Sequence, residues 1–236
     1  MQRLKEKALI LGIELNDNQL DKFDRYYKML IEKNRVMNLT AITDKNEVID
    51  KHFVDSLAFV KTECGLSDQK VLDIGTGAGF PGIPLKIAFP KLQIVLLDSL
   101  NKRVRFLNEV IKELQLEGIE AIHGRAEDFA KKAEYRESFH VVVSRAVANL
   151  TVLSEYCIPY VLEGGYFCPY KSGDIKEEIK QAKKAIKVLG GSLQNIIFFE
   201  IPDTDMKRSI LKIKKEKATP RRFPRKSGLP SKEPIC

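Results

Sequence analysis

The spacing of apolar residues changes near residue 70 and divides the chain into two parts. Before that point apolar side chains recur every three or four positions, which is the repeat of one face of an amphipathic helix. In residues 18–34 these side chains are Leu20, Phe23, Tyr27, Leu30 and Ile31. Asn16 or Asp17 can cap this helix, residues 38–42 interrupt the pattern, and residues 48–60 resume it. We therefore expect residues 1–60 to form an N-terminal helical extension.

From Lys70 onward, short apolar runs alternate with helical stretches. The runs cover residues 71–74, 94–98, 119–122, 141–143 and 165–170, and the helical stretches lie at about 82–89, 101–115, 150–162 and 175–189. Continuous apolar strands separated by helices are typical of a mostly parallel sheet with helices on both faces. Residues 195–201 and 208–214 partly alternate in polarity and predict an antiparallel hairpin at the sheet edge. The pattern predicts one α/β domain over residues 61–236.

A glycine-rich loop follows the first predicted strand directly. Gly75, Gly77 and Gly79 lie between Asp73 and Phe80, at the carboxyl end of the strand, where ligands bind in open α/β sheets. A nicotinamide dinucleotide site needs the spacing G-x-G-x-x-G, and here Phe80 occupies the place of the third glycine. Binding loops for S-adenosylmethionine (SAM) commonly read acid-x-G-x-G-x-G, which these residues match in full. A tight turn without a ligand is the remaining alternative, and the match favours SAM and a Rossmann-like methyltransferase fold.

Polar residues after the next two strands fit a nucleoside ligand. Asp98 ends the second strand and can accept hydrogen bonds from both hydroxyls of a ribose, although it or Ser99 could instead cap the helix that starts at Asn101. Residues 125–128 follow the third strand, where SAM enzymes usually place a polar loop around the adenine. Exposed loop charges without a ligand are the alternative for this loop. Together with the glycine loop, Asp98 and residues 125–128 support a SAM site.

The residues after the fourth strand bear on which atom is methylated. Arg145 lies there, but the [DN]-P-P-[YF] motif of exocyclic amine methylation is missing, and neither Cys157 nor Cys168 has the setting of a nucleophile. A ring nitrogen such as guanine N7 carries no proton, so its methylation needs alignment in a desolvated pocket and no general base. His52 and Asp55, three residues apart, could act together as a base, with a contact along one helix face as the alternative.

Positive charge is concentrated near the C-terminus. The chain has 40 Lys and Arg against 32 Asp and Glu, which gives a formal net charge of +8. Nine of these cations lie between Lys212 and Lys232 against one acid, Glu216, so this segment carries the whole excess. One basic segment favours a polyanionic partner, with a merely solvated tail as the alternative. Beside a base-modifying site, it favours a tail that follows an RNA backbone and uses Phe223 as well.

Cysteine and hydropathy patterns exclude several other classes. The four cysteines form no CxxC pair and no zinc-like spacing with histidine, so we expect buried free thiols and no metal. No stretch approaches the roughly 20 apolar residues of a membrane span, and the N-terminus is a poor signal peptide. We expect a cytoplasmic protein that acts as a monomer and has no membrane partner.

The order of these motifs resembles the RsmG (GidB) family of guanine-N7 methyltransferases that act on small-subunit ribosomal RNA. The resemblance spans nearly the whole chain and is carried by residues 38–41, 52–57, 73–82, 97–100, 102–103, 144–146 and 224–232. The glycine loop alone indicates only the class of enzyme. The loop followed by D-S-L, S-R-A and P-R-K in this order is specific to the family.

The resemblance implies a SAM-dependent enzyme that methylates N7 of a guanine in 16S ribosomal RNA, within the 30S particle or an assembly intermediate. It implies SAM contacts at Gly75, Phe80, Ala126, Glu127 and Arg145, with Asp98, Ser99 and Leu100 near the ribose. Arg145 would lie between the methyl donor and the RNA and hold guanine O6 or a phosphate, or else form a salt bridge at the sheet edge. Two other functions stay open: a non-catalytic RNA-binding or ribosome assembly factor with a SAM fold, and a methyltransferase for a non-RNA substrate.

Overall fold

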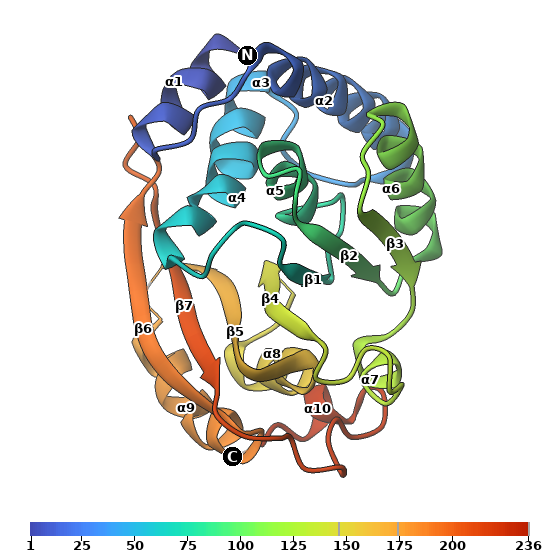
Figure 1. The fold of residues 1–236 in the computed structure, drawn as a ribbon, viewed down its shortest axis with the longest axis vertical. Helices are drawn as coiled ribbons and strands as arrows, with labels where there is room; N and C mark the ends of the chain where they lie inside the picture. Colours follow the sequence, from blue (N-terminus) through green and yellow to red (C-terminus); the bar gives the residue numbers. More distant parts are fainter. Residues whose placement is uncertain (146, 174, 236) are drawn as a thin grey trace.

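The computed structural model describes residues 1–145, 147–173 and 175–235, and in this part of the chain seven strands form one sheet (Figure 1). The strands are β1 (Lys70–Ile74), β2 (Gln93–Asp98), β3 (Ile119–His123), β4 (Phe139–Arg145), β5 (Val161–Ser172), β6 (Gly191–Glu200) and β7 (Lys207–Lys215). Their order is β3-β2-β1-β4-β5-β7-β6; β1 to β5 run parallel, and β7 is antiparallel to both β5 and β6. The predicted parallel sheet with an antiparallel edge pair is confirmed.

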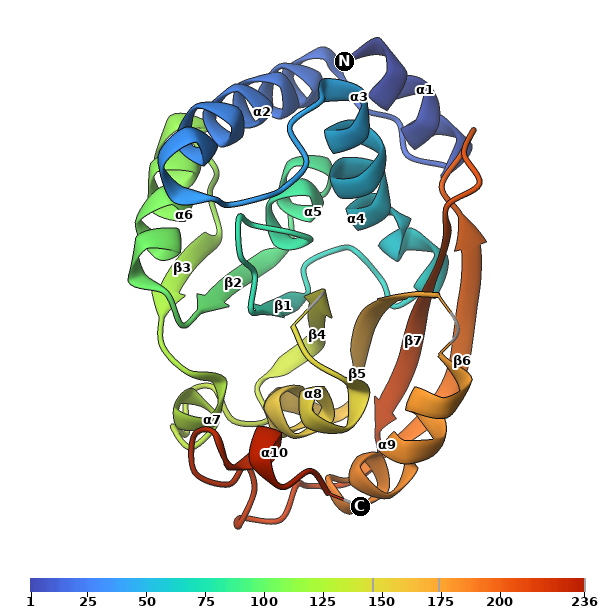
Figure 2. The ribbon, with the colours of Figure 1, turned by 180° about the vertical axis from the view of Figure 1, so that it is seen from behind.

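Helices cover both faces of the sheet, as the opposite views in Figures 1 and 2 show. One layer contains α1 (Gln2–Ile10), α2 (Asp17–Met37), α3 (Lys45–Val48), the π-helix η1 (Ile49–Val54), α4 (Asp55–Leu57), the 3₁₀ helix η2 (Ala58–Thr62), α5 (Gly82–Ala88) and α6 (Asn101–Glu113). The other contains α7 (Ala126–Phe129), α8 (Leu150–Cys157), the 3₁₀ helix η3 (Ile158–Tyr160), α9 (Lys176–Val188) and α10 (Leu229–Lys232).

The sheet separates two hydrophobic cores. Val141 and Val143 of β4 pack into the core under α2, α5 and α6, whereas Val142 between them packs into the core under α8 and α9. Successive side chains of a strand point to opposite faces, so a continuous apolar run serves both layers. The chain runs from β1 outward to β3 and then returns to β4 beside β1. This reversal creates the crevice at the carboxyl ends of β1 and β4 in which a ligand can bind.

The N-terminal helices share the core of the sheet. The side chain of Asn16 accepts a hydrogen bond from Gln19 N and forms a capping box at the start of α2, and Asn38 ends this helix in the left-handed region. Phe23 and Phe53 belong to the same core as Ile83 of α5. The division into an extension over 1–60 and a domain over 61–236 stays a prediction.

The predicted helix over 150–162 and strand over 165–170 have wrong boundaries. α8 ends at Cys157, a 3₁₀ turn follows, and β5 already begins at Val161. Pro159 lies in this turn, and because proline has no backbone N–H it cannot continue the hydrogen bonds of an α-helix. Val161 then pairs with Phe139 of β4, so the sheet extends further than the apolar pattern indicated.

The C-terminal segment 216–235 packs against the body of the molecule. Phe223 is buried in the core under α8 and α9, so its predicted contact with RNA is wrong. The guanidinium of Arg136 donates to the carbonyl oxygens of Thr219 and Phe223 at 2.7 and 2.9 Å. Arg225 forms several hydrogen bonds with Glu155, whose carboxylate is buried in α8. Backbone and core contacts therefore fix a segment that the sequence indicated to be irregular.

Two negative expectations can be compared with the described residues. Cys64, Cys157 and Cys168 are free and buried, as predicted, while Cys236 lies outside the described residues. Within the described chain, no helix combines the length and the apolar character that crossing a membrane requires.

Candidate active site

The glycine loop joins β1 to α5 and is held from the side by α2. Gly75, Gly77 and Gly79 all have positive φ, and a Cβ atom at Gly79 would lie 2.5 Å from Ile83 Cδ1 and 2.8 Å from the hydroxyl of Tyr26. That hydroxyl donates a hydrogen bond to Ala78 O at 2.6 Å. Glycine is therefore required at position 79 both by conformation and by packing.

The carboxylate of Asp73 stabilises the glycine loop through hydrogen bonds. Its Oδ2 accepts hydrogen bonds from Thr76 Oγ1 at 2.7 Å and from Gly82 N at 2.9 Å. Its Oδ1 is buried and has no partner among the described residues. Burial raises the pKa of Asp73 to about 6. An unpaired buried carboxylate oxygen is costly, so this atom is a candidate acceptor for a ligand.

Asp98 ties the loop to the end of β2. Its Oδ2 accepts from Gly77 N at 2.9 Å, and its Oδ1 accepts from Leu100 N at 2.8 Å. Leu100 occupies the N-cap position of α6, where no side chain caps the helix, so the N-cap alternative for Asp98 and Ser99 is wrong. The carboxylate instead fixes the relative position of two loops at adjacent strand ends.

A cavity of about 230 Å³ lies above these strand ends. Four of the predicted cofactor residues line it: Gly75, Ser99, Ala126 and Glu127. It is also lined by Tyr156, Gly228 and Ser231, which the sequence did not indicate. Val147, which also lines it, is 40% exposed, and Leu100, next to the lining residue Ser99, is 43% exposed. Apolar surface beside a polar cavity suits the flat face of a nucleobase.

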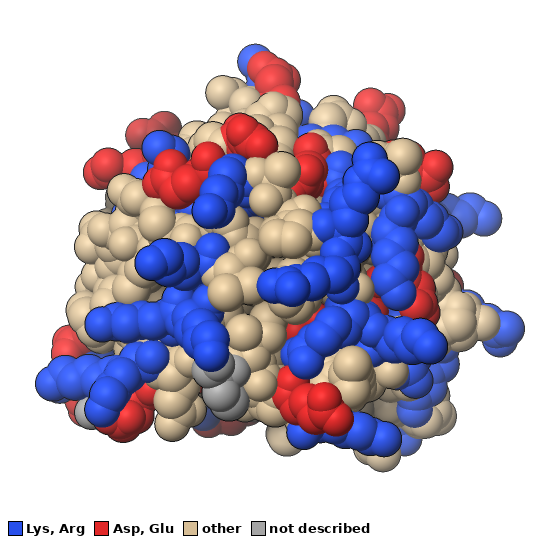
Figure 3. All heavy atoms as spheres, turned by 90° about the horizontal axis from the view of Figure 1, so that it is seen from below, with Lys and Arg blue, Asp and Glu red and all other residues tan. Residues whose placement is uncertain are grey.

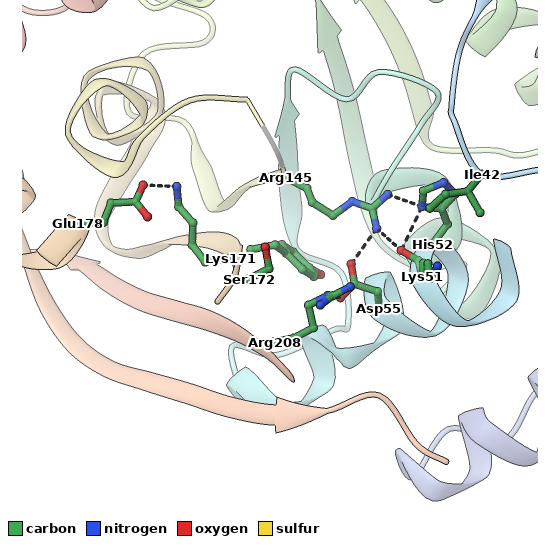
Figure 4. Close-up of a pocket in the computed structure, with 10 residues that line it drawn as sticks. Ile42, Lys51, His52, Asp55, Arg145, Lys171, Ser172, Glu178 and Arg208 are labelled. Carbon is green, nitrogen blue, oxygen red and sulfur yellow. Dashed lines mark hydrogen bonds and ion pairs between the residues drawn. The ribbon is translucent and has the colours of Figure 1, made fainter. Parts of the chain in front are cut away.

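A second, larger cavity of about 460 Å³ lies at the ends of β4 and β5 (Figure 4). Its lining residues are Ile42, Lys51, His52, Asp55, Arg145, Tyr170, Lys171, Ser172, Glu178 and Arg208. Arg145 lines this cavity and Val147, two residues later, lines the smaller one. Ala146 between them lies outside the described residues. The two cavities are therefore lined by residues only two positions apart in the chain.

The guanidinium of Arg145 is held from three directions. Nη1 donates to Asp55 Oδ2 at 2.8 Å and to Lys51 O at 3.0 Å, and Nη2 lies 3.2 Å from His52 Nδ1. The guanidinium carbon lies 5.0 Å from the ring centre of Phe80, on which His52 also stacks at 4.6 Å. The salt bridge considered for Arg145 is thus present, and it connects β4 to the N-terminal helices.

His52 is a neutral partner of Arg145. Burial and the nearby Arg145 charge lower the pKa of His52 to about 4. Arginine can only donate, so we assign Nδ1 as the acceptor and the ring proton to Nε2, which lies 2.9 Å from Thr40 Oγ1. Nδ1 also lies 3.0 Å from Lys51 O, but in this tautomer both atoms are acceptors and form no hydrogen bond, and Lys51 O accepts from Arg145. His52 and Asp55 both contact the guanidinium of Arg145, so their contacts extend beyond one helix face. Their action together as a base stays a prediction.

Asp55 lies between two arginines. Its Oδ1 is 3.5 Å from Nε of Arg208 on β7, in addition to the bond from Arg145 to Oδ2. Across the cavity Lys171 pairs with Glu178 at 2.6 Å (Figure 4). Arg208 and Lys171 were missed by the sequence reasoning. Lys171 directly follows the predicted strand 165–170. Arg145 was singled out because it follows a predicted strand, and the same criterion would have identified Lys171.

No group of three or more metal-ligating side chains occurs within the described ranges 1–145, 147–173 and 175–235.

Similarity to known proteins agrees with this geometry. The GidB family, described as rRNA small subunit methyltransferase G, matches residues 19–210. "Ribosomal RNA small subunit methyltransferase G" of Lachnoclostridium phytofermentans is 55% identical over 225 residues, which cover 95% of this chain and 93% of that protein. The protein of the same name in Desulforamulus reducens is 54% identical over 233 residues, covering 99% and 97%.

A solved structure supports the fold at lower identity. A SAM-dependent methyltransferase from Aquifex aeolicus superposes with a TM-score of 0.54 and 16% identity, covering 75% of this chain and 96% of that one. The sheet with its helical layers is thus the Rossmann-like methyltransferase fold. Given the family match over residues 19–210 and the near full-length identity to two curated members, the chain belongs to the rRNA small subunit methyltransferase G family.

Proposed function

We propose that this protein transfers the methyl group of SAM to N7 of a specific guanine in the 16S RNA of the small ribosomal subunit. The observation that carries the proposal is the pair of cavities at the carboxyl ends of the strands, one lined by Arg145 and the other by Val147 two residues later. The smaller cavity takes the cofactor, and the larger, cationic one takes the target nucleotide. Relatives that carry the name of a ribosomal RNA small subunit methyltransferase support the choice of substrate.

The cofactor site would consist of the residues expected from the sequence. These are Gly75, Gly77, Gly79, Phe80, Asp98, Ser99, Leu100, Ala126, Glu127 and Arg145. Two observations support the fit to SAM. The loop at Gly77 has no side-chain or backbone atom closer than 4.0 Å to where a Cβ would lie, which leaves space for a ligand beside the backbone. The unpaired Oδ1 of Asp73 would accept a hydrogen bond from the ammonium group of SAM.

SAM supplies a methyl group on a positively charged sulfur, and the protein supplies alignment. Guanine N7 has a free lone pair and no proton, so the reaction needs no base. The structure agrees with this requirement, because His52 and Asp55 already accept hydrogen bonds from Arg145. A guanidinium has five N–H groups, and three of those of Arg145 have partners among the described residues. The two others can donate to guanine O6, which lies beside N7, or to a phosphate.

The outer surface supports an RNA partner. Figure 3 shows many Lys and Arg side chains and fewer acids on the face that carries α9 and α10. Exposed cations of α9 and the C-terminal segment are Lys180, Lys183, Lys184, Lys187, Lys217, Arg221, Arg222, Lys226 and Lys232. Lys215 and Arg225 of the same segment are instead engaged with Glu137 and Glu155. The basic surface is therefore wider than the tail that the sequence indicated, since α9 contributes to it.

The test is methyl transfer from tritiated SAM to naked 16S RNA and to isolated small subunits in parallel. We expect incorporation into at least one of them and strand cleavage at a single guanine after borohydride and aniline treatment, which detects N7 methylation. Incorporation without such a cut would refute the N7 assignment, and no incorporation into either RNA substrate would refute the proposed function. The ratio of the two signals identifies the form of RNA that the enzyme recognises.

We further propose a monomer that works in the cytoplasm, where its ribosomal substrate is assembled. Size-exclusion chromatography with light scattering should give the mass of one chain, 26.8 kDa. A dimer mass at micromolar concentration would contradict this part of the proposal.

A further inference from the structure

The C-terminal segment contributes directly to the smaller cavity. Gly228 and Ser231 line it together with Glu127 and Tyr156, although Gly228 lies 101 positions after Glu127 in the sequence. Residues 225–232, which we call the strap, reach this place by crossing α7 and α8. Its anchor is Arg225, whose side chain and backbone N–H donate to the buried carboxylate of Glu155 in α8.

Three polar contacts fasten the strap beside the cavity. Gly228 N donates to Glu127 Oε1 at 2.9 Å, and Ser227 Oγ donates to Asp128 Oδ1 at 3.0 Å. The hydroxyls of Tyr156 and Ser231 lie 2.8 Å apart. The first contact fixes the carboxylate of Glu127, a side chain that is itself buried. The strap thus sets the position of a polar side chain in the cavity wall.

We propose that residues 227–231, with Tyr156, form one wall of the cofactor site and hold Glu127 for the adenosine part of SAM. The inference rests on the proposed function, because it takes the smaller cavity to be the SAM site. A cofactor pocket needs burial of most of the ligand surface, and without this wall the cavity would open to solvent. The same segment carries exposed Lys226 and Lys232, so one strap faces the cofactor on its inner side and the basic surface on its outer side.

The test measures binding of SAM to the full chain and its variants by titration calorimetry, without RNA. Removing the Tyr156–Ser231 hydrogen bond should weaken binding about fivefold, which is the effect of one net hydrogen bond. Tyr156→Phe and Ser231→Ala should each give this loss. The double variant should lose no more than either alone, because both hydroxyls act through one contact. Tyr27→Phe, which removes a hydroxyl bonded to Thr43 O in the other helical layer, is the matched control and should bind normally.

Deletion of residues 227–236 should weaken SAM binding by at least about tenfold, since a whole wall is lost. Lys226→Ala with Lys232→Ala removes the charges but keeps the strap, so its affinity for SAM should stay within about twofold. If the deletion fails to fold, as judged by circular dichroism, the point variants decide. SAM affinity unchanged in Tyr156→Phe and Ser231→Ala would overturn the wall, whereas a full chain that binds no SAM would instead refute the proposed function.

Discussion

Asp55 is a buried carboxylate that faces two guanidinium groups in the larger cavity. We expect Arg145→Ala to lower methyl transfer by at least about a hundredfold, because the guanidinium that we propose to orient the guanine is lost. It should also lower the free energy of unfolding by about 3 kcal/mol, since Asp55 loses its closest partner. The measurements are initial rates with tritiated SAM and urea denaturation.

A second substitution separates the two effects. Adding Asp55→Asn to Arg145→Ala removes the unpaired charge, so stability should recover while activity stays lost. Arg145→Lys keeps the charge but loses the planar fork and should remain strongly impaired. Full activity in Arg145→Ala would exclude any role of this residue in holding the nucleotide.

Asp73 and His52 have pKa shifts that act on stability in opposite directions. Burial raises the pKa of Asp73 from 3.8 to about 6, so in this range the folded chain holds the extra proton and stability falls as pH rises. Burial lowers the pKa of His52 from 6.5 to about 4, so the unfolded chain holds the extra proton and stability rises with pH. Each shift corresponds to about 3 kcal/mol, and the two slopes should largely cancel in the natural protein.

Single substitutions should reveal each slope. In Asp73→Asn the side-chain oxygen can still accept from Thr76 and Gly82. Its free energy of unfolding should rise more steeply than that of the natural protein between about pH 4 and 6.5, because the opposing slope of Asp73 is removed and that of His52 remains. In His52→Gln the slope should shift the other way between about pH 4 and 6, toward lower stability at higher pH, because that of Asp73 remains and that of His52 is removed. Urea denaturation at half-unit pH steps measures both. If the free energy of unfolding changed with pH in the same way in both variants, the pKa shifts of Asp73 and His52 would have no effect on stability.

At the scale of elements, the glycine loop offers a matched pair of substitutions. Gly77 and Gly79 both have positive φ, but only a Cβ at Gly79 would collide, with Ile83 and Tyr26. Gly77→Ala should therefore reduce stability by only about 1 kcal/mol while weakening SAM binding. Gly79→Ala should reduce stability by about 3 kcal/mol or more, because α2 and α5 must move apart. Thermal unfolding and SAM titration of both variants compare the effects; equal losses of stability would contradict this account.

Much of this element-level arrangement could be predicted from the sequence. Apolar runs and strand ends predicted the sheet, the loop and the place of Arg145, because those features depend on local patterns. The contacts of Arg145 could not be predicted, since Asp55 reaches it from an element 90 residues before it. Asp55 is in turn shared with Arg208, which lies 63 residues after Arg145. The strap was missed for the same reason. Its basic composition indicated an exposed tail, but Phe223 and the buried Glu155 hold it against α8 and α9.

For the whole molecule, the basic surface predicts salt-dependent RNA binding. Lys180→Glu with Lys184→Glu on α9 should raise the KM for RNA and leave kcat unchanged, because these exposed side chains line neither cavity. The slope of log affinity against log salt should fall by about 1 for each lost phosphate contact. Lys5→Glu with Lys28→Glu, exposed on the opposite helical layer, is the control with the same charge change. Equal effects of the two pairs would argue against a localised RNA surface.

The predicted division at residue 60 can be tested by truncation. Residues 61–236 alone would lose Phe23 and Phe53 from the shared core and Tyr26 from the glycine loop. We expect this fragment to lack a cooperative thermal transition, because the apolar surface of α5 and α6 that the N-terminal helices cover becomes exposed to water. A cooperative transition of the fragment, followed by circular dichroism, would show that the first 60 residues are an independent addition.

The strap also bears on how the protein is made. Gly228 lies 153 positions after Gly75, yet both line the smaller cavity, which we propose to be the SAM site. Chains fold from the N-terminus while they are being synthesised. A nascent chain therefore completes its central strands well before its pocket. Copies released by a premature stop before Gly228 would lack one side of that pocket, so we expect incomplete polypeptides to withdraw little SAM from the cell.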